Sequence, residues 1–254
     1  MPVLRSLLIA FSTYSRIPVP QVEWNEENRR WSMCFFPLVG LVIGLLLWGW
    51  LVLCSSLKIG PFLRGAVSAM LPLLLTGGIH MDGYMATIDA LASWQPKEKR
   101  LEILKDSRVG AFAVMGCAGY LLLSAALYAE AGPADGIRLA GVFVLSRALS
   151  AFALIRLKNA RNRGMLDDTA KASGRRAVAF SSAVYAFFCL LLWLVSGSWT
   201  AAPLCALAAV LCCLYYRHMA YKQFGGVTGD LAGWFLQVTE LVLSAVIVIG
   251  GRLL

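Results

Sequence analysis

The sequence predicts an all-α protein, a polytopic membrane bundle of about seven spans with an additional interfacial helix at the N-terminus. Hydrophobic residues make up 59% of the 254 residues and charged residues only 15%, whereas soluble domains carry about 25% charged residues. Long runs with at most one charge each also approach the roughly 20 residues that cross a bilayer as a helix. These runs cover residues 35–57, 109–129, 139–155, 177–195, 199–216 and 231–249.

Shorter segments predict the remaining elements. Residues 1–20 predict an interfacial or partly re-entrant helix that ends at Pro18-Val19-Pro20, and their apolar stretch is too short for the core of a signal peptide. The uncharged run 65–79 predicts a seventh span, which we expect to break at Gly77-Gly78. No Gly-, Ser- or Pro-rich linker divides the chain, so residues 1–254 form one predicted domain.

The net charge of +9 is explained by loops rather than by a nucleic-acid partner. Lys and Arg are frequent before residue 31, in residues 94–108 and in residues 156–176, and they are sparse in the connections between these segments. Because cytoplasmic loops of membrane proteins are enriched in Lys and Arg, we expect the N-terminus, these two loops and a further loop at residues 217–226 to face the cytoplasm.

The most informative polar stretch is residues 77–90, which contains His80, Asp82 and Asp89. Positions 82 and 89 are seven residues apart, about 20° short of two helical turns, so the two carboxylates share one helix face. Mg²⁺ usually takes one or two protein carboxylates and completes its shell with water and substrate phosphate. The stretch therefore predicts a metal site, while His80 is compatible with a metal ligand, a phosphate contact or a polar interfacial residue.

Two further stretches carry candidate phosphate and metal contacts, and each also has a simpler interpretation. In residues 101–110, Lys105 and Arg108 can hold phosphate and Asp106 can bind metal or act as a base, but the stretch is equally compatible with a charged loop. In residues 224–230, glycines allow the backbone to approach a phosphate at the start of a helix, while Thr228 or Asp230 can instead be a helix cap.

Two charges lie deep inside predicted spans, Arg147 and Glu240. An intramembrane charge indicates either function or an internal partner, so the sequence leaves open whether the two pair with each other or contact substrate. Arg161 and Arg163 in the basic loop are compatible with a solvated surface or with binding of an anionic substrate.

Taken together, these stretches resemble the cobalamin synthase family, also called adenosylcobinamide-GDP ribazoletransferase. The resemblance begins with SRIPVP at residues 15–20 and FPLVG at residues 36–40. It is most specific at GGIHMDG, residues 77–83, and at residues 101–110 and 225–230. The order of these motifs along nearly the whole chain makes the resemblance strong.

The resemblance implies a Mg²⁺-dependent phosphotransferase in the cytoplasmic (inner) membrane of a prokaryote. A ribose hydroxyl of α-ribazole, or of α-ribazole phosphate, attacks the phosphorus of adenosylcobinamide-GDP next to the cobinamide linker, and GMP leaves. The implied metal ligands are Asp82, Asp89 and Asp106, and the implied catalytic group is Asp82, Asp89, Asp106 and Asp230. The implied substrate-binding residues are His80, Lys105, Ser107, Arg108, Arg161, Gly226, Thr228 and Gly229. A homo-oligomer is compatible with the sequence, which does not set the oligomeric state.

The first motif departs from the family pattern at one position, where a third acid is replaced by Ala86. We therefore expect slow turnover.

Two other classes of membrane protein share some of these features. CDP-alcohol phosphotransferases also use helix-borne aspartates, but their Asp-Gly-x-x-Ala-Arg signature is absent because Thr87 follows Ala86. A transporter would line a path with Asp82, Arg147 and Glu240, yet most candidate residues fall on one predicted membrane face.

Overall fold

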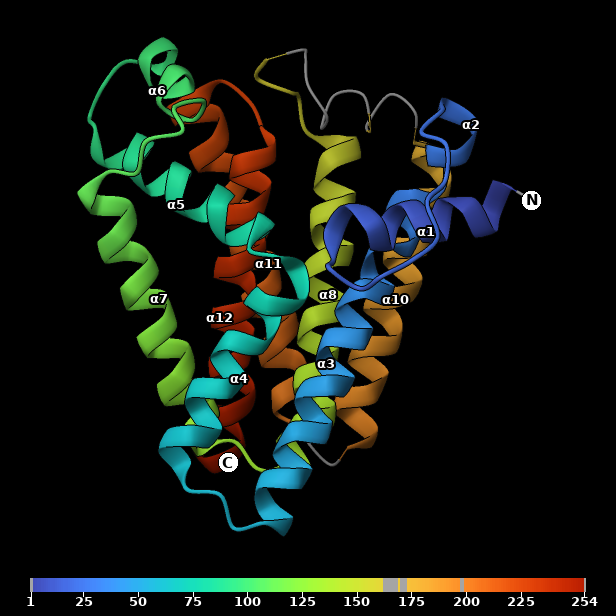
Figure 1. Cartoon of the computed structure of the whole chain (residues 1–254), viewed down its shortest axis with the longest axis vertical. Helices are drawn as coiled ribbons and strands as arrows, with labels where there is room; N and C mark the ends of the chain where they lie inside the picture. Colours follow the sequence, from blue (N-terminus) through green and yellow to red (C-terminus); the bar gives the residue numbers. More distant parts are fainter. Residues whose placement is uncertain (1, 162–168, 170–172, 197–198, 254) are drawn as a thin grey trace.

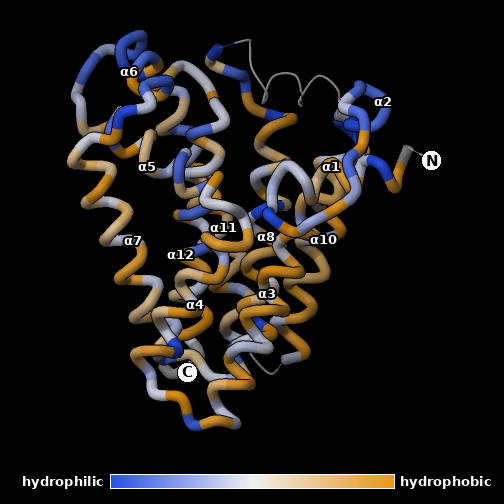
Figure 2. Tube along the Cα trace, viewed as in Figure 1, coloured by the Kyte–Doolittle hydropathy of each residue, from blue (hydrophilic) through white to orange (hydrophobic). Residues whose placement is uncertain are grey.

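The protein is a bundle of helices, seen in a computed structural model that describes residues 2–161, 169, 173–196 and 199–253 (Figure 1). Among the described residues, six helices are long and apolar enough to cross a membrane. They are α3 (Ser32–Ser56), α7 (Ala111–Glu130), α8 (Pro133–Arg156), α10 (Arg175–Val195), α11 (Ala201–Phe224) and α12 (Gly229–Leu253). Figure 2 shows hydrophobic residues along these spans and hydrophilic residues gathered at the end that carries α6 and α2.

The predicted seventh span is broken, as expected, at Gly77-Gly78. Helix α4 (Pro61–Thr76) ends at Gly77 and α5 (Ile79–Ala92) begins after Gly78, and the two helices meet at 99°. Both glycines have positive φ, 64° and 78°, a conformation that side chains with a Cβ rarely adopt. The break turns α5 across the bundle, which places Asp82 and Asp89 near one end of it. Counting α4 and α5 as one span gives the seven that the sequence predicts.

The short helices lie at the same end of the bundle as α5 (Figure 1). Helix α1 (Pro2–Tyr14) lies across the ends of the spans rather than along them, as an interfacial helix would, and α2 (Glu26–Arg29) and α6 (Lys97–Ile103) lie nearby. One expectation is wrong here: residues 217–226 are not mainly a loop, because α11 continues to Phe224. The described parts of the three segments rich in Lys and Arg nevertheless lie at one end of the bundle, the end that carries α2 and α6 (Figure 1).

Glycines let the central helices approach closely. Helices α8 and α12 are the most buried spans. A Cβ at Gly40 or Gly44 of α3 would collide with the backbone of α8 at Phe143 and Ala140, so this small-residue pair allows the tight helix contact that such motifs favour in lipid. Glycines also allow α5 to approach α12 closely, and this contact forms part of the site described next.

Candidate active site

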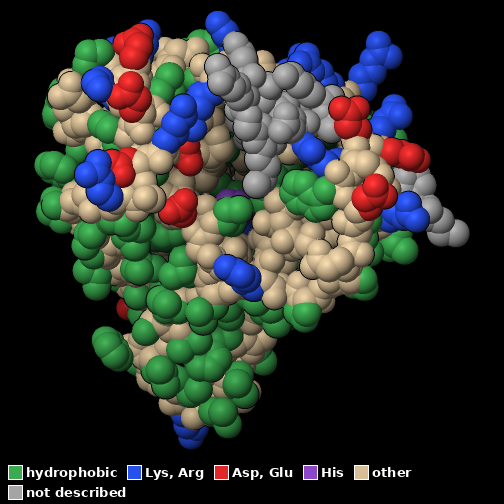
Figure 3. Space-filling model, turned by 45° about the horizontal axis from the view of Figure 1, so that its top comes forward, with side chains coloured by type: hydrophobic (Ala, Val, Ile, Leu, Met, Phe, Trp, Pro, Cys, Tyr) green, Lys and Arg blue, Asp and Glu red, His purple; other side chains and the backbone are tan. Residues whose placement is uncertain are grey.

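A cavity of about 250 Å³ lies between α5, α8 and α12, closed on one side by α1 and α3. Asp82 of α5 and Asp230 of α12 line it, as do Gly229, which was predicted, and Ser150 and Thr169, which were not. Figure 3 shows acidic and basic side chains gathered at this end of the molecule, above a broad hydrophobic surface. The cavity thus joins the first and third predicted motifs, which are about 150 residues apart in the chain.

Two glycines set the distance between the acidic helices. A Cβ at Gly83 would lie 2.7 Å from the backbone oxygen of Asp230, and a Cβ at Gly233 would lie 2.8 Å from the backbone oxygen of His80. Both distances are shorter than real contacts allow, so only glycine permits this approach. As a result, Asp82 lies close enough to Asp230 for their negative charges to repel.

Asp230 is held by a basic side chain from the loop after α8. Nη1 of Arg161 lies 3.6 Å from Oδ2 of Asp230, and Nη2 of Arg161 donates a hydrogen bond to the carbonyl oxygen of Leu101, at 2.9 Å. Arg161 therefore connects the third motif to the stretch that carries α6. The sequence left its role open between a solvated surface and an anion contact, and the structure places it beside the cavity acids.

The residues just before Asp230 mainly shape the backbone. Gly226 lies against the backbone of residues 158–160, where a side chain would not fit, and the Val227 amide donates to the Lys158 carbonyl oxygen at 2.8 Å. The hydroxyl of Thr228 accepts a hydrogen bond from the Leu231 amide at 3.3 Å. Thr228 is therefore a helix cap of α12, one of the two interpretations that the sequence allowed.

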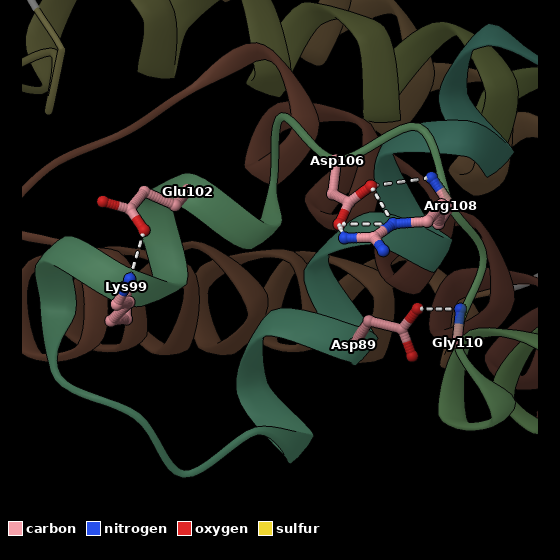
Figure 4. Close-up of polar contacts among 6 residues, drawn as sticks. All are labelled: Asp89, Lys99, Glu102, Asp106, Arg108 and Gly110. Atoms are coloured by element: carbon pink, nitrogen blue, oxygen red, sulfur yellow. Dashed lines mark hydrogen bonds and ion pairs between the residues drawn. The ribbon is translucent and has the colours of Figure 1, made fainter.

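Asp89 lies about two helical turns beyond Asp82 but has a different environment. One carboxylate oxygen accepts a hydrogen bond from the amide of Gly110 at 2.7 Å (Figure 4). The other accepts one from the amide of Ala113 at 2.8 Å, at the start of α7. A carboxylate at a helix N-terminus satisfies amides that lack partners within the helix and interacts favourably with its dipole. Asp89 therefore anchors α7 to α5.

Asp106 forms an ion pair with Arg108 on an exposed loop (Figure 4). Nη2 and Nε of Arg108 donate to the carboxylate at 2.7 to 3.1 Å. These hydrogen bonds from Arg108 lower the pKa of Asp106 to about 2. Lys105 and Ser107 are exposed on the same loop, and none of these four residues lines the cavity.

The three predicted metal ligands are therefore not gathered at one point. Within the described ranges, no group of three His, Cys, Asp or Glu side chains is placed to hold a metal ion. The structure pairs Asp82 with Asp230 instead, while Asp89 and Asp106 have partners of their own. Metal binding by Asp89 and Asp106 stays a prediction from the sequence, and it requires both side chains to exchange those partners.

Ala86 lies on α5 between Asp82 and Asp89. It packs against a buried apolar cluster that includes Leu104, Tyr216 and Leu231. Ala86 itself is not among the residues that line the cavity. A carboxylate here would need to turn away from the cluster in order to reach Asp82.

His80 forms part of the cavity wall and is only 7% exposed. Its ring lies 6.2 Å from the ring of Tyr14 and 5.7 Å from that of Phe36, measured between centroids. Its Nε2 atom is buried and has no hydrogen-bond partner among the described residues. Because buried polar atoms are rarely left unpaired, His80 is a candidate contact for a bound molecule. Sequence reasoning missed Tyr14 and Phe36, which are far from the motif in the chain and carry no polar spacing signal.

The two intramembrane charges pair with each other. Nη1 of Arg147 lies 2.6 Å from Oε1 of Glu240, and their side chains are 1% and 2% exposed. Ser146 donates a further hydrogen bond to Glu240 at 3.2 Å. The pair ties α8 to α12 behind the cavity, so the alternative of direct substrate contact is not needed to explain these charges.

The fold and the cavity define a polytopic helical membrane protein with an acidic, partly polar site at one end of its bundle. The chain belongs to the cobalamin-5-phosphate synthase family, whose family model matches residues 6–248. The resemblance seen in the motifs is thereby confirmed, and membership of this family is favoured over the two alternatives, a transporter and a CDP-alcohol phosphotransferase.

Curated relatives agree with the family. A protein of Lachnoclostridium phytofermentans named adenosylcobinamide-GDP ribazoletransferase is 42% identical over 250 residues, which cover 98% of this chain and 95% of the relative. Proteins of the same name from Geobacillus thermodenitrificans and Desulfitobacterium hafniense are 36% and 34% identical, and each alignment covers at least 94% of both chains. No solved structure matches the chain.

Proposed function

We propose that this protein joins adenosylcobinamide-GDP to α-ribazole or its phosphate and releases GMP, in a Mg²⁺-dependent phosphoryl transfer at the cytoplasmic face of a prokaryotic inner membrane. One bond forms, from a ribose hydroxyl oxygen of the ribazole to the phosphorus next to the cobinamide linker. One bond breaks, from that phosphorus to the oxygen that leaves with GMP. The observation that carries the proposal is the approach of Asp82 to Asp230 in the cavity of a chain whose family is known.

The donor set fits a hard divalent cation. Asp82 and Asp230 present carboxylate oxygens to the cavity, and Mg²⁺ prefers oxygen ligands with one or two protein carboxylates. When bound there, the ion would neutralise charge on the diphosphate. Two carboxylates that repel each other across a cavity also gain from a cation between them.

The chain's own residues supply positioning. Phosphoryl transfer depends mainly on orientation and on charge stabilisation. Arg161 fixes Asp230, and the unpaired Nε2 of His80 can hydrogen-bond the attacking hydroxyl. Asp230 can complete the metal shell or accept the proton of that hydroxyl. The exposed Lys105, Ser107 and Arg108 lie on the stretch that Arg161 links to the cavity, from which they can contact the outer part of the nucleotide.

The test is an assay of purified protein with adenosylcobinamide-GDP and α-ribazole, with and without Mg²⁺. We expect GMP and the joined product in equal amounts, and neither without Mg²⁺. Asp230→Asn separates its two roles. A ligand role raises the Mg²⁺ concentration that gives half-maximal rate, whereas a proton-acceptor role lowers the rate at saturating Mg²⁺. Product formation that ignores Mg²⁺ would contradict the proposal.

The membrane orientation is tested separately. Single cysteines in residues 94–108 and at Arg175, in a cysteine-free background, should react with an impermeant reagent only from the cytoplasmic side. The reason is the concentration of Lys and Arg in these segments. Labelling of the two positions from opposite sides would contradict the topology.

A further inference from the structure

A second hollow lies between α8 and α11, beside Phe235 of α12. Its volume is about 490 Å³, within the range of about 300–1,000 Å³ typical of small-molecule sites. Phe235 of α12 lines it, together with Phe152 of α8 and Leu214 of α11. None of its lining residues also lines the active-site cavity. We call this hollow the α8–α11 groove.

The walls of the groove face the membrane. Phe152 is 38% exposed and Leu214 is 57% exposed, although both lie within predicted spans. Exposed apolar side chains on membrane-spanning helices are normally covered by lipid. The groove is therefore open to the acyl-chain region of the bilayer rather than to the aqueous substrate.

Two arginines close the groove toward the end of the bundle that carries the active site. Arg156 is the last residue of α8, and Arg217 lies two turns before the end of α11. Both are exposed, and neither makes an ion pair with any described residue. The Arg156 guanidinium lies over the ring of Phe152, 5.4 Å from its centroid, which directs it along the groove. Lys222 and His218 line an adjoining hollow beside Arg217.

We propose that the α8–α11 groove binds an anionic phospholipid of the surrounding bilayer. Its phosphate would lie between Arg156 and Arg217, and an acyl chain would lie along Phe152, Leu214 and Phe235. Arginine binds phosphate through two parallel hydrogen bonds, and basic pockets between spans on the cytoplasmic side are typical sites for anionic head groups. The described part of the groove lining contains no acidic residue that would compete for the arginines.

The charge pattern favours lipid over the other possible occupants. A second copy of the chain would have to bring an apolar surface that also carries acids, whereas a phospholipid supplies both features in one molecule. A soluble phosphate compound would leave the exposed apolar walls uncovered. These alternatives become outcomes of the test.

The test uses the full chain in nanodiscs that contain phosphatidylglycerol and phosphatidylcholine in equal amounts. After release into the gas phase, native mass spectrometry counts the lipids that stay bound. We expect one retained phosphatidylglycerol per chain, and an about 30-fold lower affinity for it in Arg156→Gln/Arg217→Gln, since each of the two basic residues near an anionic lipid contributes about 1 kcal/mol. The matched control is Arg175→Gln/Arg176→Gln, which removes two exposed arginines at the start of α10 and should retain the lipid.

A second variant tests the apolar wall without changing charge. Ala153 lines the groove, and Ala153→Phe should fill it and lower phosphatidylglycerol retention while both arginines remain. Equal retention of both lipids by the unchanged protein, or undiminished retention by the Arg156→Gln/Arg217→Gln variant, would overturn the proposal. A dimer that forms without bound lipid, and that dissociates in the Arg156→Gln/Arg217→Gln variant, would identify a second copy of the chain as the occupant. That result would also overturn the proposal.

Discussion

The contact between Asp89 and the start of α7 gives a prediction that separates two acids of the same motif. Asp89→Ala removes the acceptor of two hydrogen bonds, to the amides of Gly110 and Ala113. Loss of a helix cap costs about 1 kcal/mol, and a hydrogen bond to a charged group contributes about 1.5–3 kcal/mol. Gly110 is partly exposed, whereas Ala113 is only 1% exposed, so we expect water to replace the lost carboxylate at Gly110 but not at Ala113.

We therefore expect Asp89→Ala to lower the free energy of unfolding by about 2–4 kcal/mol, and Asp89→Asn by less, because the amide oxygen retains one acceptor. The assay is reversible unfolding in mixed micelles with increasing denaturing detergent. Asp82→Ala is the matched control, since Asp82 is exposed on the same helix, and its stability should not change. Equal stability of the Asp89 and Asp82 variants would refute the anchoring role of Asp89.

Three more predictions concern α5 and the intramembrane ion pair, and the second of them follows from the family motif rather than from a contact. Gly83→Ala should displace α5 from α12 and lower GMP release at least about tenfold, because its Cβ cannot fit; an unchanged rate would show that the spacing of Asp82 is not critical. Ala86→Asp should raise GMP release at saturating Mg²⁺ at least about tenfold, or roughly 1.4 kcal/mol of barrier; equal rates would place position 86 outside the site. Arg147→Met or Glu240→Leu alone should cost about 3–5 kcal/mol of stability, and the double substitution less; additive losses, measured by the same unfolding assay, would contradict a direct pair.

The sequence predicted the fold well because lipid imposes a strict rule on composition. A span must be apolar over about 20 residues, so the six long helices were recognisable from the chain alone. Gly77-Gly78 also predicted the break correctly, but not its consequence. After the 99° break, α5 brings Gly83 against the backbone of α12, and no local pattern in the sequence encodes that contact.

The site was predicted in part for the same reason. Helical spacing placed Asp82 and Asp89 on one face, and that remains geometrically sound. It did not reveal that Asp89 faces the start of α7, nor that Asp82 meets Asp230 from the other end of the chain. Pairing between distant segments depends on tertiary packing, and the one available signal was the pair of small residues, Gly83 and Gly233, on the two helices.

The most direct test of the account is the position of a divalent ion when substrate is bound. Crystals of the protein grown with adenosylcobinamide-GDP and Mn²⁺ in place of Mg²⁺ would show the ion in an anomalous-difference map. The account predicts a peak within coordination distance of Asp82 and Asp230, with the diphosphate beside it. A peak at Asp106 on the exposed loop, with none in the cavity, would contradict it.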